Sequence, residues 1–265
     1  MKPARVLTIA GSDSCGGAGI QADLKTIAAL GALGMSVITA VTAQNTLGIQ
    51  GIREIPPEFV QRQFESVITD IGADAAKTGM LANTKILKVV AGMVRKYRIK
   101  KLVVDPVMAA KRGEALIKGD VREALIRELI PLALVVVPNI PEAEILADMK
   151  IATVNEMKKA ADIIYKFGGK NVVVKGGHLV GDAVDVLYDG KEYFTFSSKR
   201  IYRKEAHGTG CTFSAAITTL LAKGKSVFEA VEGAKVYITG AIRVAYKVGA
   251  GYSLIDHLAP VLYDK

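Results

Sequence analysis

The sequence predicts an α/β fold built on a mostly parallel sheet. Short runs of Val, Ile, Leu and Ala, typical of strands buried on both faces, alternate with segments that repeat apolar residues at helical spacing. This alternation predicts parallel strands joined by right-handed crossovers. Half of the 265 residues are hydrophobic, and no linker rich in Pro, Gly or Ser divides the chain. We therefore expect one domain with a sizeable core over residues 1–265.

The elements follow one another in a regular order. Six runs are expected to be buried strands: residues 6–10, 37–42, 73–78, 102–105, 134–137 and 172–175. Helical spacing between them predicts helices over residues 20–33, 58–69, 84–97, 121–129 and 154–167. Asp189-Gly190, within residues 181–196, predicts a hairpin. Two helices, over residues 212–222 and 227–248, are expected to close the chain.

The formal charge of +9 raises the question of nucleic acid, which basic surfaces attract without sequence information. The lysines and arginines are scattered, and the one dense cluster, residues 95–101, is typical of a solvated connection. Residues 26–52 lack charge, but glycines and polar residues divide them into a helix end, a strand and a loop. We expect neither a nucleic-acid partner nor a membrane span.

Cysteine and histidine usage indicates a reducing compartment. Two cysteines, Cys15 and Cys211, are too few for a disulfide framework or a Cys-based zinc site, and the three histidines lack metal-binding spacing. No secretory signal is expected, because the apolar stretch 6–10 is short and continues into Gly11-Ser12-Asp13. We expect a cytoplasmic protein.

The most informative motif is His207-Gly208-Thr209-Gly210-Cys211, which directly precedes a predicted helix. Two glycines let the backbone turn its N–H groups toward one point, and the helix N-terminus adds about half a positive charge. The motif therefore predicts an anion site. A cysteine in the first turn of such a helix is expected to have a thiol pKa below the free value of about 8.5. The alternative is a plain loop before a core helix.

Polar residues follow several of the predicted strands. Ligands of parallel sheets bind beyond the carboxyl ends of the strands. A phosphate-transfer site needs a metal, a cation, a cradle of N–H groups and a base. Asp105 and Glu142 could supply oxygen ligands for Mg²⁺, and Lys175 could neutralise phosphate. Structural roles stay open for each: a turn cap at Asp105, a helix cap at Glu142 and an ion pair at Lys175.

The usual nucleotide motifs are absent. No GxxxxGK[ST] occurs, and Gly16-Gly17-Ala18-Gly19 is separated from the first predicted strand by Ser12-Asp13-Ser14-Cys15. This spacing is typical of a loop that covers a substrate and differs from a dinucleotide-binding turn. A P-loop or Rossmann enzyme is therefore disfavoured.

Seven motifs occur in order along almost the whole chain: AGSDSCGGAGIQADLKT (10–26), TAVTAQNTLG (39–48), KTGML (77–81), VVDPVM (103–108), PNIPEAE (138–144), VKGGH (174–178) and HGTGCTFSAAI (207–217). Together they resemble the hydroxymethylpyrimidine and phosphomethylpyrimidine kinase family of thiamine biosynthesis, in the ribokinase superfamily. The resemblance implies a ribokinase-like three-layer α/β/α sandwich with a mostly parallel central sheet, and usually a homodimer. It also implies two successive phosphate transfers from ATP with Mg²⁺, first to hydroxymethylpyrimidine and then to its phosphate.

The resemblance implies a role for individual residues. Gln44 would hydrogen-bond the pyrimidine edge, since its carboxamide has a donor and an acceptor to match an aminopyrimidine. The rest of the substrate pocket would be formed by Gly11, Ala18, Asp23, Met80 and Val107.

The same resemblance implies the phosphate-transfer groups. Asn139 and Glu142 match an N-x-x-E element that acts on metal and phosphate through water, and Asp105 would join the metal network. Lys175 and Thr209 would contact phosphate. The anion hole would consist of Gly208, Thr209, Gly210 and Cys211. Cys211 stands where many sugar kinases of the superfamily have Asp, and it would accept the proton of the substrate hydroxyl.

Two alternatives stay open. Pyridoxal also has a hydroxymethyl group on a flat nitrogen ring, so the first alternative is a pyridoxal kinase or a dual-specificity enzyme of the same superfamily. Gln44 and Met80 favour the pyrimidine without excluding the pyridine. A non-catalytic nucleotide-binding protein is disfavoured by Asp105, Glu142, Lys175 and Cys211. The adenine pocket is expected near residues 200–206 and the final helices.

Overall fold

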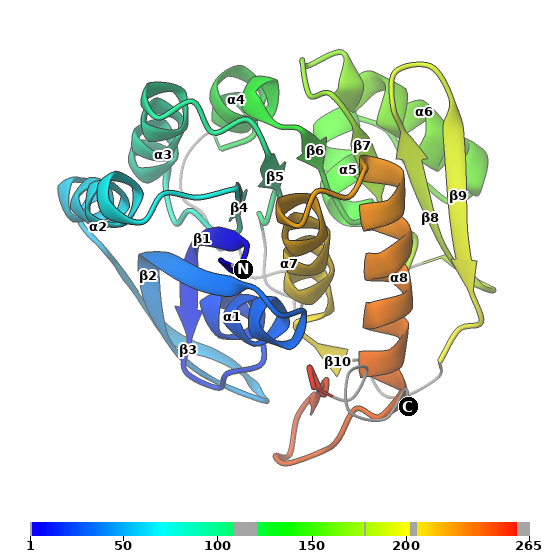
Figure 1. The fold of residues 1–265 in the computed structure, drawn as a ribbon. Coiled ribbons are helices and arrows are strands. Elements are labelled where there is room, and N and C mark those ends of the chain that lie inside the picture. Colours follow the sequence, from blue (N-terminus) through cyan, green and yellow to red (C-terminus); the bar gives the residue numbers. More distant parts are fainter. Residues whose placement is uncertain (1, 109–120, 178, 202–205, 259–265) are drawn as a thin grey trace.

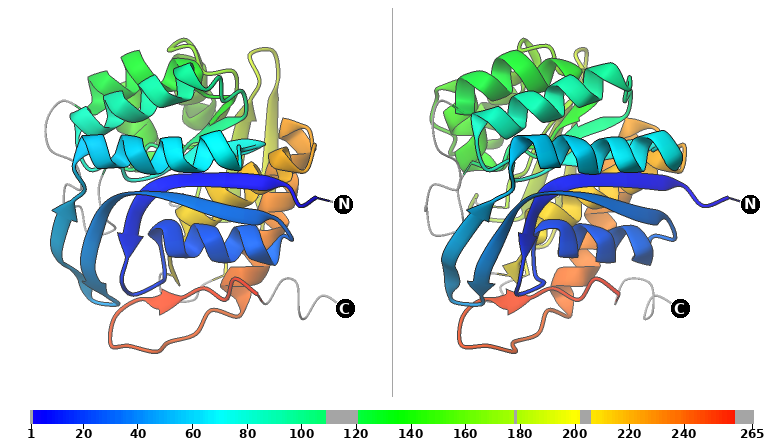
Figure 2. Two further views of the ribbon diagram at one scale, coloured as in Figure 1. Left: turned by 60° about the vertical axis from the view of Figure 1, so that its left-hand side comes forward. Right: turned by 90° about the vertical axis from the view of Figure 1, so that its left-hand side faces the viewer.

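The computed structural model describes residues 2–108, 121–177, 179–201 and 206–258 (Figure 1). A nine-stranded sheet of order β3-β2-β1-β4-β5-β6-β7-β8-β9 lies between two layers of helices, which Figure 2 shows from the side. The expected α/β/α sandwich with a mostly parallel sheet is confirmed.

The six predicted strands all belong to this sheet and run parallel: β1 (Arg5–Asp13), β2 (Leu33–Asn45), β4 (Ala75–Thr78), β5 (Leu102–Val104), β6 (Val135–Val136) and β7 (Val172–Val174). Antiparallel strands extend both edges, with β3 (Gly48–Glu54) at one edge and the predicted hairpin, β8 (Ala183–Tyr188) and β9 (Tyr193–Ser198), at the other. A separate pair is formed by β10 (Ala206–His207) and β11 (Ser253–Leu254). β3 was not predicted from the sequence, because most of its residues are exposed and it has no buried apolar run.

The helices divide between the two faces of the sheet (Figures 1 and 2). One face is covered by α1 (Gly19–Ala29), α7 (Thr209–Ala222) and α8 (Val227–Arg243). The other is covered by α2 (Pro57–Asp70), α3 (Thr84–Lys96), α4 (Val121–Ala124), α5 (Ile140–Ala147) and α6 (Val154–Tyr165). A π-helical turn (Leu125–Leu129) and a 3₁₀ turn (Ile130–Leu132) continue α4.

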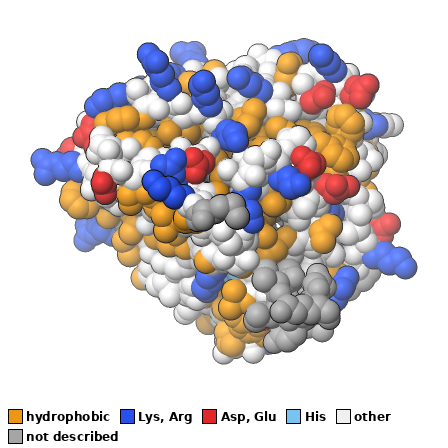
Figure 3. All heavy atoms as spheres, viewed as in Figure 1, with side chains coloured by type: hydrophobic (Ala, Val, Ile, Leu, Met, Phe, Trp, Pro, Cys, Tyr) orange, Lys and Arg blue, Asp and Glu red, His pale blue; other side chains and the backbone are white. Residues whose placement is uncertain are grey.

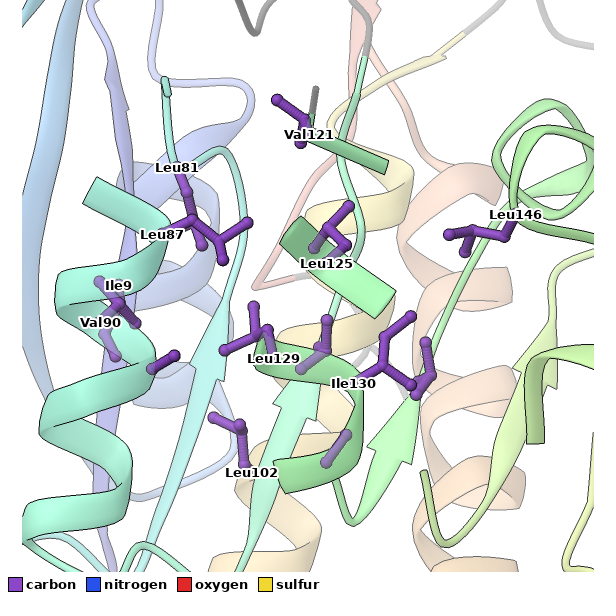
Figure 4. Packing of buried hydrophobic residues seen from close by; sticks show 14 of the residues in the cluster. Ile9, Leu81, Leu87, Val90, Leu102, Val121, Leu125, Leu129, Ile130 and Leu146 are labelled. Carbon is purple, nitrogen blue, oxygen red and sulfur yellow. The ribbon is translucent and has the colours of Figure 1, made fainter. Parts of the chain in front are cut away.

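Each face of the sheet has its own hydrophobic core. Successive residues of β5 alternate between the cores, since Leu102 and Val104 pack on the α2–α6 side and Val103 packs on the α7–α8 side. Figure 4 shows part of the first core, where Leu102, Leu129 and Ile130 lie close together. Burial on both faces explains why the strands consist of short apolar runs.

Several helix boundaries differ from the predicted ones. The helix predicted over residues 20–33 ends at Ala29, because Gly31 takes a left-handed φ of 71° and the chain enters β2 at Leu33. The final helix ends at Arg243 instead of residue 248, where the chain turns back and Tyr246 pairs with Leu254. None of the helices in the described ranges is long and apolar enough to cross a bilayer. In Figure 3, Lys and Arg are dispersed among acidic and apolar side chains.

Candidate active site

A cavity of about 840 Å³ opens at the carboxyl ends of the parallel strands. It lies where the strand order reverses, since β1 pairs with β2 on one side and with β4 on the other. This position is the usual ligand site of open α/β sheets. Every predicted site residue except Asp23 lines the cavity. The structure therefore brings together residues that are up to two hundred positions apart in sequence.

The motif at residues 207–211 forms a turn that leads into α7. Gly208 has a left-handed φ of 84°, and a Cβ there would lie 1.7 Å from the Gly17 carbonyl oxygen, so only glycine fits. The first bond within the helix is donated by the Thr212 amide to Gly208 O, at 3.0 Å. The amides of Thr209, Gly210 and Cys211 come before that first bond and so have no acceptor within the helix. They lie at the positive end of a 14-residue helix. This turn has the form of the predicted anion cradle.

An ion pair lies against the cradle. Lys175 Nζ is 2.9 Å from Asp105 Oδ1, and Ser214 Oγ donates to Asp105 Oδ2 at 2.9 Å. A Cβ on Gly210 would lie 3.4 Å from Lys175 Nζ and 4.0 Å from Asp105 Oδ2. The start of α7 and the Lys175–Asp105 pair thus border the same small space. The ion pair that was considered as a structural role for Lys175 is present, and it holds the Lys175 ammonium at the cavity wall.

Asn139 and Glu142 begin α5 with a reciprocal cap. Asn139 Oδ1 accepts from the Glu142 amide at 2.9 Å, and Glu142 Oε2 accepts from the Asn139 amide at 2.8 Å. The helix cap considered for Glu142 is therefore present, although the side chain also lines the cavity. Burial raises the pKa of the Glu142 carboxyl to about 7, even though Lys175 opposes the shift.

The carboxylates of Asp105 and Glu142 fit Mg²⁺ better than zinc. The described residues contain no group of three or more His, Cys, Asp or Glu that could hold a metal ion. Mg²⁺ keeps several waters and needs only one or two protein carboxylates, whereas zinc sites use three or four protein ligands. The donor set at the cavity is thus consistent with the predicted metal.

The prediction of a lowered thiol pKa at Cys211 is wrong. Burial raises this pKa to about 12, and the negative charges of Asp23 and Asp105 add to the rise. The nearby Lys77 ammonium and the Gly19 amide oppose the shift without overcoming it. The thiol of the protein without ligands is therefore protonated at neutral pH. The favourable helix dipole is outweighed by desolvation.

Asp23 was expected in the wall of the substrate pocket, but it is not among the residues that line the cavity. Its carboxylate is fully buried, where Oδ1 lies 2.7 Å from Lys77 Nζ and Oδ2 accepts from Thr8 Oγ1 at 2.6 Å. A Cβ on Gly79, which does line the cavity, would lie 3.9 Å from Lys77 Nζ. The Lys77–Asp23 pair therefore lies directly under the cavity floor. Lys77 had no predicted role.

Gln44 lies in the cavity beside two residues that the sequence analysis left without a role. Gln44 Nε2 is 3.0 Å from His207 Nε2, which is also 3.0 Å from Asp13 Oδ2. The Asp13 carboxylate accepts from the amides of Cys15, Gly17 and Ala18, and so orders the glycine-rich loop. An Asp followed by glycines after a strand was a signal for this turn.

Gly11 packs directly on Met80 at the cavity wall. A Cβ on Gly11 would lie 2.4 Å from the Met80 methyl carbon, so a larger residue there would displace the end of the Met80 side chain. Ala18 and Val107 complete this part of the wall. The predicted substrate residues other than Asp23 therefore line the same cavity as Gln44.

The far end of the cavity contains a second ion pair. Asp185 Oδ2 lies 2.8 Å from Lys235 Nζ, and Asp185 Oδ1 accepts from the Gly176 amide at 2.9 Å. Arg200 donates to the carbonyls of Gly177 and Gly181 beside it. The expected adenine region, residues 200–206, lies partly outside the described residues, as does His178 of the VKGGH motif.

Comparisons with known proteins agree on one family. Residues 13–256 match the family described as phosphomethylpyrimidine kinase. The hydroxymethylpyrimidine/phosphomethylpyrimidine kinase of Streptomyces coelicolor is 46% identical over 255 residues, which cover 96% of this chain and 94% of that protein. The thiamine biosynthesis bifunctional protein ThiED of Geobacter sulfurreducens is 50% identical over 254 residues, 96% of this chain. The present chain spans 52% of that relative.

A solved structure has the same fold over almost the full length. The ADP complex of Bacillus subtilis pyridoxal kinase superposes with a TM-score of 0.93 at 39% identity, over 98% of this chain and 100% of that one.

Proposed function

The chain belongs to the phosphomethylpyrimidine kinase family, and from that premise we propose that it transfers phosphate from ATP to hydroxymethylpyrimidine and then to hydroxymethylpyrimidine phosphate. The product is the pyrimidine diphosphate precursor of thiamine. One observation carries the proposal: the amides at the start of α7 and the Lys175–Asp105 pair border one space, in a cavity that also contains Gln44.

The acceptor ring binds beside Gln44. Its carboxamide hydrogen-bonds the edge of the aminopyrimidine, which offers both donors and acceptors. The faces of the ring contact the apolar part of the wall, formed by Gly11, Ala18, Met80 and Val107. This arrangement directs the hydroxymethyl group toward the start of α7.

Phosphate is held by fixed positive charge. The amides of Thr209, Gly210 and Cys211 bind the oxygens on which negative charge increases during transfer, and Lys175 neutralises part of it. Asn139 orders the start of α5 beside this space. Asp105 and Glu142 would hold Mg²⁺, which neutralises charge on the phosphate oxygens when it is bound.

Cys211 accepts a proton in the first transfer only. The hydroxymethyl oxygen bonds to the γ-phosphorus of ATP as the bond from that phosphorus to the bridging oxygen breaks and ADP leaves. Cys211 Sγ takes up the proton that the hydroxymethyl oxygen loses. Since burial holds the pKa of the Cys211 thiol near 12, only the small thiolate fraction is active in this role. The acceptor of the second transfer is a phosphate oxygen, whose last proton has a pKa of about 6, so no base is needed there.

The remaining expectations fit the same proposal. Residues 1–265 form one kinase domain that is cytoplasmic and assembles as a homodimer. Both cysteines are free thiols, which supports a reducing compartment. Val41 and Ile52 are exposed on opposite faces of the β2–β3 edge, and Leu47 is exposed in the turn between the two strands, so apolar side chains there are accessible to a second copy. Light scattering tests the dimer.

Pyridoxal is the second candidate acceptor. The fold similarity to Bacillus subtilis pyridoxal kinase, with a TM-score of 0.93, favours it. Sequence identity favours the pyrimidine, since it is 46% to the Streptomyces coelicolor pyrimidine kinase and 39% to the pyridoxal kinase.

One assay tests both candidates. Purified protein, ATP and Mg²⁺ are incubated separately with hydroxymethylpyrimidine, its monophosphate, pyridoxal, ribose or adenosine, and products are identified by mass. We expect the pyrimidine to gain one and then a second phosphate. Product from pyridoxal alone would replace the proposal by its alternative, and ATP turnover with none of the acceptors would contradict both.

A further inference from the structure

His207 Nε2 faces two groups that make opposite demands on it. Asp13 Oδ2 and the end of the Gln44 amide assigned as nitrogen each lie 3.0 Å from it. A carboxylate only accepts hydrogen bonds, whereas an amide nitrogen only donates them. One ring nitrogen cannot satisfy both, because it either carries a proton or presents a lone pair.

Asp13 decides the state of the imidazole nitrogen. The amides of Cys15, Gly17 and Ala18 all donate to the Asp13 carboxylate, and these hydrogen bonds favour its ionised form. The carboxylate is therefore ionised and accepts a proton from its neighbour. His207 Nε2 consequently carries hydrogen, whether the ring is neutral or protonated.

At the other end of the Gln44 amide, Thr42 has one proton for two acceptors. Thr42 Oγ1 lies 3.0 Å from the Ser12 carbonyl oxygen and 3.1 Å from the end of the amide assigned as oxygen. Both neighbours would be acceptors, and a hydroxyl has one proton to donate. Its proton is needed by Ser12 O, which has no proton of its own.

Exchanging the two ends of the amide gives every donor an acceptor. Gln44 Oε1 and Asp13 Oδ2 then share the His207 Nε2–H in a three-centre hydrogen bond, and Gln44 Nε2 donates to Thr42 Oγ1, which donates its proton to Ser12 O. The two ends of an amide are nearly equal in size, so their hydrogen-bond partners decide the orientation. We infer that the Asp13–His207 pair fixes the orientation of the Gln44 carboxamide and thereby sets which ring edge the enzyme accepts.

The surroundings hold both residues in place for this task. Ser14 Oγ bonds the backbone oxygen and nitrogen of Gln44, both at 2.8 Å, so mainly the side-chain amide remains to be oriented. His207 lies in β10, paired with Leu254 of β11. A Cβ on Gly17 would lie 2.6 Å from His207 Cδ2, so the ring packs directly on the loop that Asp13 orders.

The orientation determines the class of acceptor. Each end of the carboxamide keeps one hydrogen-bonding site for a ligand: a lone pair of Oε1 on the His207 side and a proton of Nε2 on the Thr42 side. A flat ring with an amino group beside a ring nitrogen satisfies both sites in this order. A ring without the amino group satisfies only one. His207 and Asp13 are therefore positioning residues for a donor–acceptor edge.

The first test needs no substrate. In ¹⁵N-labelled protein the imidazole nitrogens are observed by long-range proton–nitrogen correlation, and the chain has only three histidines. The signals of His207 are those lost in His207→Gln. We expect Nε2 of His207 to be protonated from pH 6 to pH 8. An Nε2 with the shift of an unprotonated ring nitrogen would overturn the inference.

The second test measures selectivity, and it rests on the proposed function. The quantity is kcat/KM for hydroxymethylpyrimidine divided by kcat/KM for the same pyrimidine without its amino group. We expect this ratio to fall about tenfold in His207→Phe, which has no ring proton donor, and to stay within about threefold of wild type in His207→Gln, which keeps an N–H.

The ratio separates orientation from damage to the adjacent turn at Gly208. Such damage lowers both kcat/KM values together, and an unchanged ratio in His207→Phe would overturn the inference. If wild-type protein phosphorylates neither pyrimidine, the proposed function fails. The imidazole measurement still decides the orientation in that case.

Discussion

Replacing Cys211 with alanine separates the two phosphate transfers. In the proposed mechanism the thiolate removes the proton of the hydroxymethyl group, whereas above about pH 7 the phosphate acceptor of the second transfer has already lost its last proton. We therefore expect Cys211→Ala to slow phosphorylation of hydroxymethylpyrimidine. Phosphorylation of its monophosphate should stay within about threefold of wild type, because the backbone amides of the cradle remain.

The size of the effect follows from the burial of the thiol. With the pKa of Cys211 raised to about 12, roughly one thiol in ten thousand is ionised at pH 8, and each pH unit changes that fraction about tenfold. The first transfer by wild-type enzyme should accelerate about tenfold per unit from pH 7 to pH 9. In Cys211→Ala it should be independent of pH and at least ~100-fold slower than wild type at pH 9.

The assay offers each acceptor separately and follows kcat/KM from pH 6 to pH 9. Cys15→Ala is the matched control, since it removes the other thiol, which does not line the cavity. Equal losses of kcat/KM for both acceptors in Cys211→Ala would refute the proposed role of the thiolate. Cys211 would then contribute to catalysis only through its backbone amide. A first transfer with a flat pH profile in wild type would refute it as well.

Three further changes test other parts of the account. Gly210→Ala places a methyl group 3.4 Å from Lys175 Nζ, in the space between the cradle and the Lys175–Asp105 pair, so kcat should fall at least ~100-fold with no loss in Tm. Gly92→Ala in α3 is the control, because a Cβ there meets open space. This variant should gain about 0.5–1 kcal/mol of stability and keep full activity. Lys77→Met leaves the buried Asp23 carboxylate without its partner and should lower the free energy of unfolding in urea by about 3–5 kcal/mol. The double variant Lys77→Met/Asp23→Leu should recover most of this loss. Equal losses in the single and double variants would contradict the prediction. Burial lowers the pKa of His257 to about 4, so below pH 6.5 the unfolded chain binds the extra proton, and stability should fall by about 2 kcal/mol from pH 7 to pH 5. Urea unfolding of His257→Gln should lack this fall, and an identical fall in both proteins would contradict the assignment.

The strands and the anion cradle were predictable because their causes are local. Valine runs such as β7 are buried on both faces, and this burial alone selects their composition. The cradle follows from Gly208 and Gly210 at the start of a helix, where the backbone conformation and the helix end are both encoded within a few residues.

The remaining features depend on contacts between distant residues. Asp23 pairs with Lys77, 54 positions away, and nothing near Asp23 in the sequence indicates that its carboxylate turns inward. Asp13 and His207 are 194 positions apart. The predicted direction of the Cys211 pKa shift was wrong for the same reason. The helix dipole can be inferred from the local sequence, whereas the burial that desolvates the thiol depends on distant residues.

A crystal structure with hydroxymethylpyrimidine, Mg²⁺ and a non-hydrolysable ATP analogue tests the central claim most directly. The account predicts terminal phosphate oxygens about 2.7–3.1 Å from the amides of Thr209, Gly210 and Cys211, with the ring on Gln44 and the hydroxymethyl oxygen facing the phosphorus. A terminal phosphate bound away from the start of α7, or a hydroxymethyl group directed away from it, would contradict the account.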